Sequence, residues 1–181
     1  AVAHLPLVLP PVLVGYFLLL LFGVRGPVGS WLRDAFGIQL AFTAEGAALA
    51  TAVMAFPLMV RAIRLSFEAT DRGLFEAAAV LRAGPWDRFW SMALPLAWPG
   101  VLAGAVTAFA AGLGEFGAVI TVASNVEGQT QTLPVAIYSA LQVPNGEETA
   151  LRLAAISMTA AVTGLVLAEL LQHWARRRLE A

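Results

Sequence analysis

Long apolar runs without a charged side chain constrain this chain more than any other feature. Four such runs occupy residues 5–23, 46–60, 94–113 and 153–168. An α-helix rises about 1.5 Å per residue, so about 20 residues cross the hydrocarbon core of a bilayer. The runs therefore predict an all-α membrane helical bundle with four spans, connected by loops and short interfacial helices.

The composition supports a membrane protein and excludes several functions. Hydrophobic residues make up 59% of the 181 residues and charged residues only 13%, whereas soluble domains carry about a quarter. The net charge of −1 gives no basic field for nucleic acid. Without lysine there is no G-x-x-x-x-G-K-[ST] loop for ATP. Cysteine is absent, and His4 and His173 lie far apart in sequence, so no metal site and no bound cofactor are predicted.

The first run and the loop after it contain helix-breaking residues. Pro6, Pro10 and Pro11 are compatible either with a rigid helix start or with irregular backbone lining a pathway. Loop 25–43 is expected to hold a short interfacial helix with four apolar residues: Trp31, Leu32, Phe36 and Ile38.

Arginines predict the orientation of the spans. Arg61, Arg64, Arg72, Arg82 and Arg88 follow the second run or lie in the loop after it, and residues 176–178 are all arginine. Because positive residues accumulate on the cytoplasmic side, the central loop and the C-terminus are both expected there. Arg61 and Arg64 themselves are either snorkelling anchors or substrate contacts.

Small residues recur every four positions in the third run, at Gly100, Gly104, Ala108 and Gly112. Such a ladder lets another helix approach closely, either within the bundle or at a dimer seam.

A carboxylate stands at the end of the third run. An ionisable group at membrane depth is a functional candidate, although Glu115 is also compatible with a helix cap or an ion pair. The expected gate or pathway residues are those around it: Gly114, Glu115, Phe116, Gly117 and Thr121. Residues 133–142 predict a helix too short to span.

A motif in the central loop resembles a known family. Glu76-Ala77-Ala78 is followed eighteen and nineteen positions later by Leu94-Pro95. This spacing resembles the EAA loop of the permeases of type I ABC importers, here about residues 66–92. The resemblance departs at Arg82, where the family usually has glycine. It implies a coupling helix, and its residues would be Glu76, Ala77, Ala78, Ala79, Arg82, Ala83, Gly84 and Pro85.

Three further segments resemble the permeases of molybdate transporters, with sulfate and tungstate permeases sharing part of the pattern. They are HLPLVLPP at 4–11, FPLMVRAIR at 56–64 and LGEFGA at 113–118. The resemblance implies an ABC transmembrane type-1 domain over residues 1–181 that lacks a first span. It also implies a homodimer in the bacterial inner membrane, with two cytoplasmic ATPase subunits that bind ATP and Mg, and an extracytoplasmic oxyanion-binding protein.

Two other readings are weighed against a motor-driven permease. A membrane-embedded enzyme needs paired acids or histidines, and Glu68, Asp71 and Asp87 lie among arginines and aromatics, as in a solvated loop. A secondary transporter without a motor often shows paired half-repeats, and none is evident. The chain is therefore expected to be a transport subunit without an enzymatic site of its own.

Overall fold

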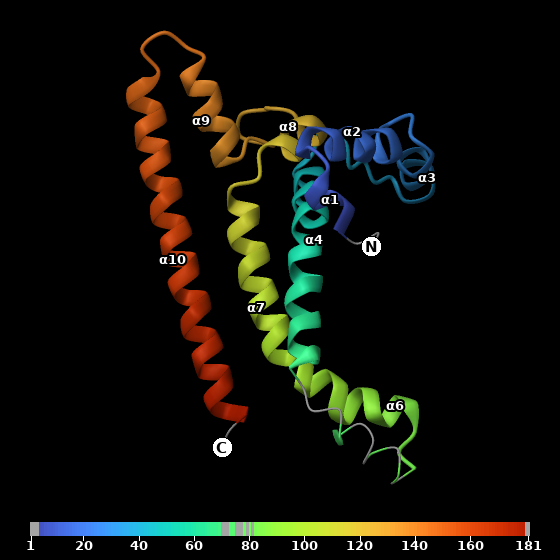
Figure 1. Cartoon of the computed structure of the whole chain (residues 1–181). Coiled ribbons are helices and arrows are strands. Elements are labelled where there is room, and N and C mark those ends of the chain that lie inside the picture. The colour runs from blue at the N-terminus through green and yellow to red at the C-terminus, as the bar shows by residue number, and fades with distance from the viewer. Residues whose placement is uncertain (1–3, 70–72, 75–77, 79, 81, 180–181) are drawn as a thin grey trace.

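The computed structural model describes residues 4–69, 73–74, 78, 80 and 82–179, and every regular element among them is a helix. This confirms the predicted all-α class. Three helical stretches are long and apolar enough to cross a membrane: α4 (Ala44–Glu68), the run Pro85–Leu113, and Glu147–Leu167 within α10 (Glu147–Leu179). In Figure 1 these three stretches run roughly side by side.

The first apolar run is not one continuous span, so this prediction of its extent was wrong. Its residues form α1 (Leu5–Val8) and α2 (Pro11–Phe22), separated by extended backbone at Leu9 and Pro10. Neither Pro10 nor Pro11 can donate a backbone hydrogen bond, which ends one helix and starts the next. The 12 residues of α2 reach only about 18 Å. In Figure 1 α2 lies across the top of the bundle instead of along it.

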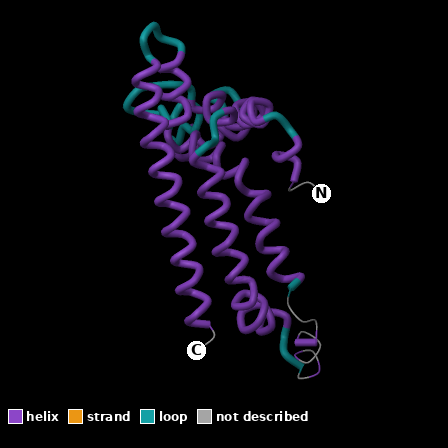
Figure 2. The backbone as a smooth tube through the Cα atoms, turned by 60° about the vertical axis from the view of Figure 1, so that its left-hand side comes forward, coloured by secondary structure: helices purple, strands orange, loops and turns teal. Residues whose placement is uncertain are grey.

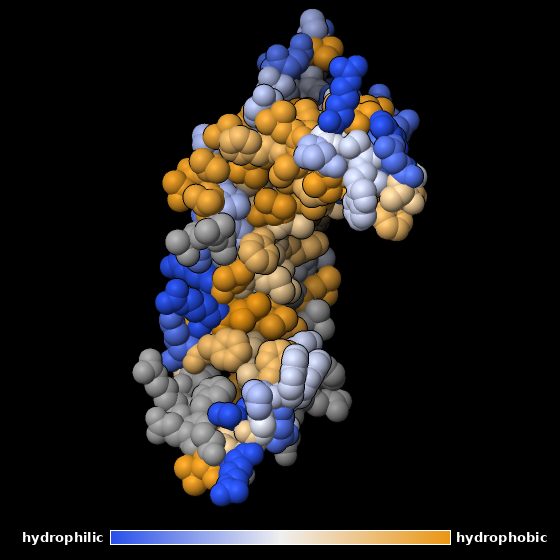
Figure 3. Space-filling model, turned by 90° about the vertical axis from the view of Figure 1, so that its right-hand side faces the viewer, coloured by the Kyte–Doolittle hydropathy of each residue, from blue (hydrophilic) through white to orange (hydrophobic). Residues whose placement is uncertain are grey.

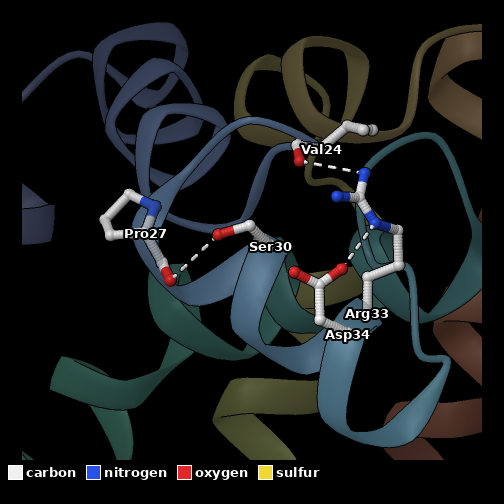
Figure 4. A network of polar contacts seen from close by, with 5 residues as sticks. All are labelled: Val24, Pro27, Ser30, Arg33 and Asp34. Atoms are coloured by element: carbon white, nitrogen blue, oxygen red, sulfur yellow. Dashed lines mark hydrogen bonds and ion pairs between the residues drawn. The ribbon is translucent and has the colours of Figure 1, made fainter.

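A short amphipathic helix, α3 (Pro27–Phe36), follows α2 at an angle of 47°, and the two together form the fourth candidate span. Figure 4 shows how polar contacts tie it to the preceding turn: the Arg33 guanidinium donates to the Val24 carbonyl at 3.2 Å. Arg33 also pairs with Asp34 at 3.3 Å. The loop therefore does contain a helix, although Ile38 follows its end. Its position at the membrane interface stays a prediction.

The second and fourth runs are longer helices than predicted. α4 begins at its N-cap Thr43, whose hydroxyl accepts the Gly46 N–H at 3.2 Å, and continues past Arg61 to Glu68. α10 starts at Glu147, six positions before the predicted start, and 33 residues give it about 50 Å. The added turns of both helices contain charged residues. The prediction missed these turns because it was defined by the apolar runs alone.

The third run matches its prediction: α7 spans Leu94–Leu113. Ahead of it lie the four-residue α6 (Pro85–Arg88) and a π-helical turn, η2 (Phe89–Ala93). The Leu94 N–H donates five residues back to the Phe89 carbonyl, the bonding pattern of a π-helix. Figure 1 shows the chain turning sideways at this junction, from α7 into α6.

Most of the buried core lies where the short helices meet α4. α2, α8 (Gly117–Ala123), the first turns of α4 and the start of α9 (Leu133–Leu141) contribute to it. Its buried residues are Val14, Leu18, Ala47, Ala50, Ala118, Val119, Val122, Ala123 and Val135. We call this region the compact end.

The opposite end of the bundle is formed by the last turns of α4 together with α6 and η2, and we call it the loop end. Figures 1 and 2 both place the C-terminal end of α10 toward the loop end, away from the compact end. α6 and the end of α10 therefore lie toward the same end of the bundle.

Burial decreases from the inner helix to the outer one. Within the apolar windows of the three stretches, 28% of α4 is buried, 17% of the Pro85–Leu113 run and 6% of α10. In Figure 3 hydrophobic atoms cover much of the middle of the molecule, and hydrophilic atoms gather at the top, at the bottom and along one edge. This surface fits a bundle whose sides face lipid.

Candidate functional site

The segment between α7 and α8 contains three of the five predicted gate residues, Gly114, Glu115 and Phe116. The other two, Gly117 and Thr121, lie within α8. The carboxylate of the segment caps α8, because Glu115 Oε1 accepts the Ala118 N–H at 2.9 Å. Glu115 is half-buried, and no ion pair involving it occurs among the described residues. Of the alternatives left open by the sequence, the structure thus provides the helix cap directly.

Phe116 packs against α9, and Gly117 and Thr121 of α8 pack against α2. A side chain at Gly117 would lie 2.8 Å from Pro11, and the Thr121 hydroxyl donates to the Gly117 carbonyl at 2.8 Å. The Phe116 ring lies 5.1 Å from that of Tyr138, centroid to centroid. Gly114 ends α7 and is exposed. The predicted gate residues therefore lie together at the compact end. Phe116 and Gly117 act there as packing groups.

A small cavity lies beside Glu115. Its volume is 180 Å³, and it is bounded by α1, the middle of α4 and the end of α7. Leu7 brings α1 to this cavity, so the broken backbone of the first run adjoins it. Thr51 and Glu115 are the polar residues in a lining that otherwise consists of Leu7, Met54, Ala55, Leu58, Ala111 and Gly112.

A larger cavity of 540 Å³ shares two lining residues of α4, Thr51 and Ala55, with the small one. Small alanines of α4 form one wall, and the loop of residues 129–132 supplies hydroxyl and amide groups to the other. The buried hydroxyl of Thr132 has no hydrogen-bond partner in the part of the chain that the structure describes, whereas that of Thr130 accepts the Val126 N–H at 3.1 Å. Sequence reasoning did not find this cavity, because its walls come from segments about 80 residues apart.

The ladder of small residues on α7 faces α4. A side chain at Gly104 would lie 3.1 Å from Met59 Cα, and one at Gly112 would lie 2.8 Å from the Thr51 methyl group. A side chain at Gly100 would lie 2.5 Å from Ser66 Cβ, and the Ser66 hydroxyl donates to the Leu96 carbonyl at 3.2 Å. Of the two predicted uses, the structure shows packing inside the bundle.

The two arginines at the end of α4 are on its surface. Arg64 pairs with Glu68 one turn later at 2.7 Å, and Arg61 is also exposed. Neither residue lines either of the two cavities described above. This placement is that of surface anchors and not of substrate contacts within those cavities.

The predicted coupling helix is only partly described. Glu76, Ala77 and Ala79 lie outside the described residues. Ala78 is buried, and its carbonyl accepts the Ala83 N–H at 3.1 Å. Arg82 adopts φ of 58°, a left-handed conformation that glycine tolerates best. Arg82 thus occupies a position whose backbone conformation favours glycine, although the sequence has arginine there.

The last two predicted coupling residues, Gly84 and Pro85, form a break in the helical backbone. Gly84 is extended, with φ of −65° and ψ of 159°, and Pro85 is the first residue of α6. Both are exposed, as is Arg82, and Ala83 is half-buried. In Figure 1 this segment is at the loop end, whereas α8 and the start of α4 are at the compact end.

Comparison with known proteins identifies the family. The family described as "binding-protein-dependent transport system inner membrane component" matches residues 1–180. Two relatives named "Molybdenum transport system permease protein ModB" are similar throughout. The one from Escherichia coli K12 is 53% identical over 98% of this chain and 78% of its own length. The one from Haemophilus influenzae is 49% identical over 99% of this chain and 76% of its own length.

A more distant relative, the "Putative molybdenum transport system permease protein YvgM" of Bacillus subtilis, is 43% identical over 78% of this chain and 62% of its own length. The family match extends over nearly every residue, and these relatives carry the same kind of name. The chain belongs to the family of binding-protein-dependent transport system inner membrane components.

Proposed function

We propose that this chain is the transmembrane subunit of an ATP-driven importer and forms the pathway for an oxyanion, molybdate in the first instance. The observation that carries this proposal is the 53% identity, over 98% of the chain, to a relative named as a molybdenum transport permease. Sulfate and tungstate are the alternative cargoes, because they are tetrahedral dianions of similar shape.

The two cavities joined at Thr51 and Ala55 are the proposed route through the compact end. Their linings contain hydroxyl and amide groups but no arginine, so a dianion would be held weakly and released readily. Glu115 would repel a dianion and is assigned to helix capping or to a gate, not to ligand binding. Selectivity then resides in the separate oxyanion-binding protein.

Coupling to ATP hydrolysis is proposed to occur at the other end. The segment from Glu76 to Ala83 would lie on the cytoplasmic side and dock into an ATPase subunit, as the resemblance implies. Closure of two ATPase subunits would draw two copies of this segment together and rock the long helices. The Gly84–Pro85 break and the π-helical turn after it would transmit that movement to α7.

Reconstitution tests this function. The permease would be co-expressed with an ABC ATPase subunit and placed in proteoliposomes, with an oxyanion-binding protein and molybdate on the outer side. We expect the ATPase to co-purify with the permease, and molybdate uptake to require ATP. Uptake that is independent of ATP, driven instead by an ion gradient and without a bound ATPase, would contradict the proposal and favour a secondary transporter.

Cargo is tested by competition in the same vesicles. Sulfate and tungstate would be added in excess with a receptor that binds all three anions, so that any remaining preference belongs to the permease. Because the lining has no charged anion ligand, we expect little discrimination at this stage. Strong preference for molybdate would place a selective anion site within the membrane.

A further inference from the structure

Three aromatic side chains form an exposed cluster at the loop end. The Trp86 and Phe89 ring centroids are 6.4 Å apart, those of Phe89 and Trp90 are 5.3 Å apart, and both pairs are nearly perpendicular. Such edge-to-face pairs hold their rings together. The side chains of Trp86, Phe89 and Trp90 are nevertheless 74%, 44% and 61% exposed. Exposed clusters of large apolar groups mark surfaces that meet a partner.

The polar side chains of the same segment, residues 86–91, lie away from the aromatic cluster. The Ser91 hydroxyl donates to the Asp87 carboxylate at 3.1 Å, one turn away on the helix surface. Arg88 is half-buried, and its buried Nε has no hydrogen-bond partner among the described residues. At about 100° per residue, Trp86, Phe89 and Trp90 share one face, and Arg88 lies on the opposite face. The segment is therefore amphipathic, and its outward face is aromatic.

The aromatic face is continuous with the exposed side of α7. Trp86, Trp90, Leu94 and Trp98 recur every four residues, and the last two are 36% and 45% exposed. α7 lies in a stretch long and apolar enough to cross a membrane, and its exposed apolar residues suit a surface that faces lipid. Trp86 and Trp90 continue this row of exposed apolar residues beyond the start of α7. At the end of a membrane span, this position corresponds to the headgroup region of the bilayer.

Charges on the neighbouring helix lie near the same level. The Ser66 hydroxyl contacts the Leu96 carbonyl, which sets the end of α4 beside the first turns of α7. Arg61 and Arg64 of α4 are exposed within two turns of Ser66. Guanidinium groups near the ends of spanning helices reach toward lipid phosphates, and tryptophan favours the interface because its ring is apolar and its N–H is polar.

We propose that Trp86, Phe89 and Trp90 form an interfacial anchor whose partner is the phospholipid of the leaflet at the loop end. The rings insert at the level of the glycerol and headgroups, beside the π-helical turn that joins the coupling segment to α7. This claim goes beyond the transport function, because it does not depend on which ion is carried. It would also give the moving segment a fixed point in the membrane.

Depth-dependent quenching of tryptophan fluorescence tests the anchor. The full chain would be placed in nanodiscs whose phospholipids carry bromine either near the carbonyl end or near the methyl end of the acyl chains. Emission from Trp86 and Trp90 is obtained as the difference between the parent protein and the Trp86→Phe/Trp90→Phe variant. Phenylalanine keeps a ring at each position, which favours folding. A Trp98→Phe variant gives the matched signal from the same stripe, about 12 Å farther along the helix from Trp90.

We expect the Trp86 and Trp90 emission to lose more intensity to the shallow bromines than to the deep ones, and little to aqueous iodide. Trp98 should show a larger share of deep quenching. Loss to iodide without loss to brominated lipid would overturn the proposal, because the rings would then lie in water. Relief of lipid quenching when a co-expressed ATPase subunit binds would also overturn it, because the occupant would then be protein.

Discussion

The compact end and the loop end of this bundle are built on different principles. At the compact end short helices cross one another, and their glycines allow backbones to touch: a side chain at Gly15 would lie 2.8 Å from the Ala118 carbonyl oxygen. At the loop end no atom of the described residues, apart from Gly84 and its two chain neighbours, lies within 4 Å of the position a side chain would take at Gly84. Close packing makes the first end resist deformation, whereas the second has room to move. This difference fits a permease in which the compact end keeps the proposed pathway rigid while an ATPase moves the loop end.

The largest effect is expected from a pair of glycine substitutions that compares the two ends. Gly15→Val should destabilise the fold by about 3 kcal/mol, because the added carbons meet α8 backbone. Gly84→Ala should change stability by no more than about 0.5 kcal/mol, because its surroundings are open and its φ is −65°. Thermal unfolding of both variants in detergent measures the difference. Equal losses of stability would remove the contrast between the ends.

A second pair of substitutions tests the contact between α4 and α7, the two helices that connect the ends. Gly104→Val should cost about 2 kcal/mol, because a side chain there would lie 3.1 Å from Met59 of α4. Ala105→Val is the control, because Ala105 is exposed on the same helix one residue later. Thermal unfolding again provides the measurement. If Ala105→Val were the more damaging variant, α7 would be rotated relative to α4.

Two substitutions at Glu115 separate capping from charge. Glu115→Ala removes the acceptor for the Ala118 N–H and should cost about 1 kcal/mol. Glu115→Gln keeps an oxygen that can accept this bond and should preserve stability. Molybdate uptake by the Gln variant then reports on the charge alone. Near-normal uptake would show that the gate does not need the charge of this carboxylate. Lost uptake in a stable protein would show that it does.

The smallest effect is expected at Arg82, where the loop end can be stabilised. Arg82→Gly relieves a left-handed backbone conformation, at φ of 58°, and should stabilise the fold by about 0.5 kcal/mol after the larger chain entropy of glycine is counted. Arg82→Ala removes the same charge without relieving the backbone and serves as the control. If both variants shift the unfolding temperature equally, the side chain and not the backbone accounts for the change.

Much of the helical framework could be predicted from sequence, and the reason lies in its boundaries. α7 begins at Leu94-Pro95 and ends before Gly114-Glu115, and both dipeptides are visible in the sequence. The end of α4 was less visible, because Arg64 and Glu68 form a surface ion pair that carries the helix beyond its apolar run. Hydropathy alone detects where a helix leaves the membrane, not where the helix stops.

The parts that could not be predicted depend on contacts between distant residues. The prolines at 6, 10 and 11 left two readings open, a rigid helix start or irregular backbone lining a pathway. Neither reading included the packing of α2 on α8, which accompanies the position of α2 across the bundle. The cavities needed Thr51 of α4 to meet Thr132 and Glu115, which come from two other segments. The gate residues and the coupling helix remain predictions, the latter partly because Glu76, Ala77 and Ala79 lie outside the described residues.

The central claim, that the segment before α6 is reached by an ATPase inside the cell, is tested most directly by single-cysteine labelling. The chain has no cysteine, so Gly84→Cys and Val143→Cys each introduce one thiol, at the loop end and between α9 and α10 respectively. A membrane-impermeant maleimide added to intact cells should label Val143→Cys and spare Gly84→Cys until the cells are opened. Labelling of Gly84→Cys from outside, with Val143→Cys protected, would contradict the account.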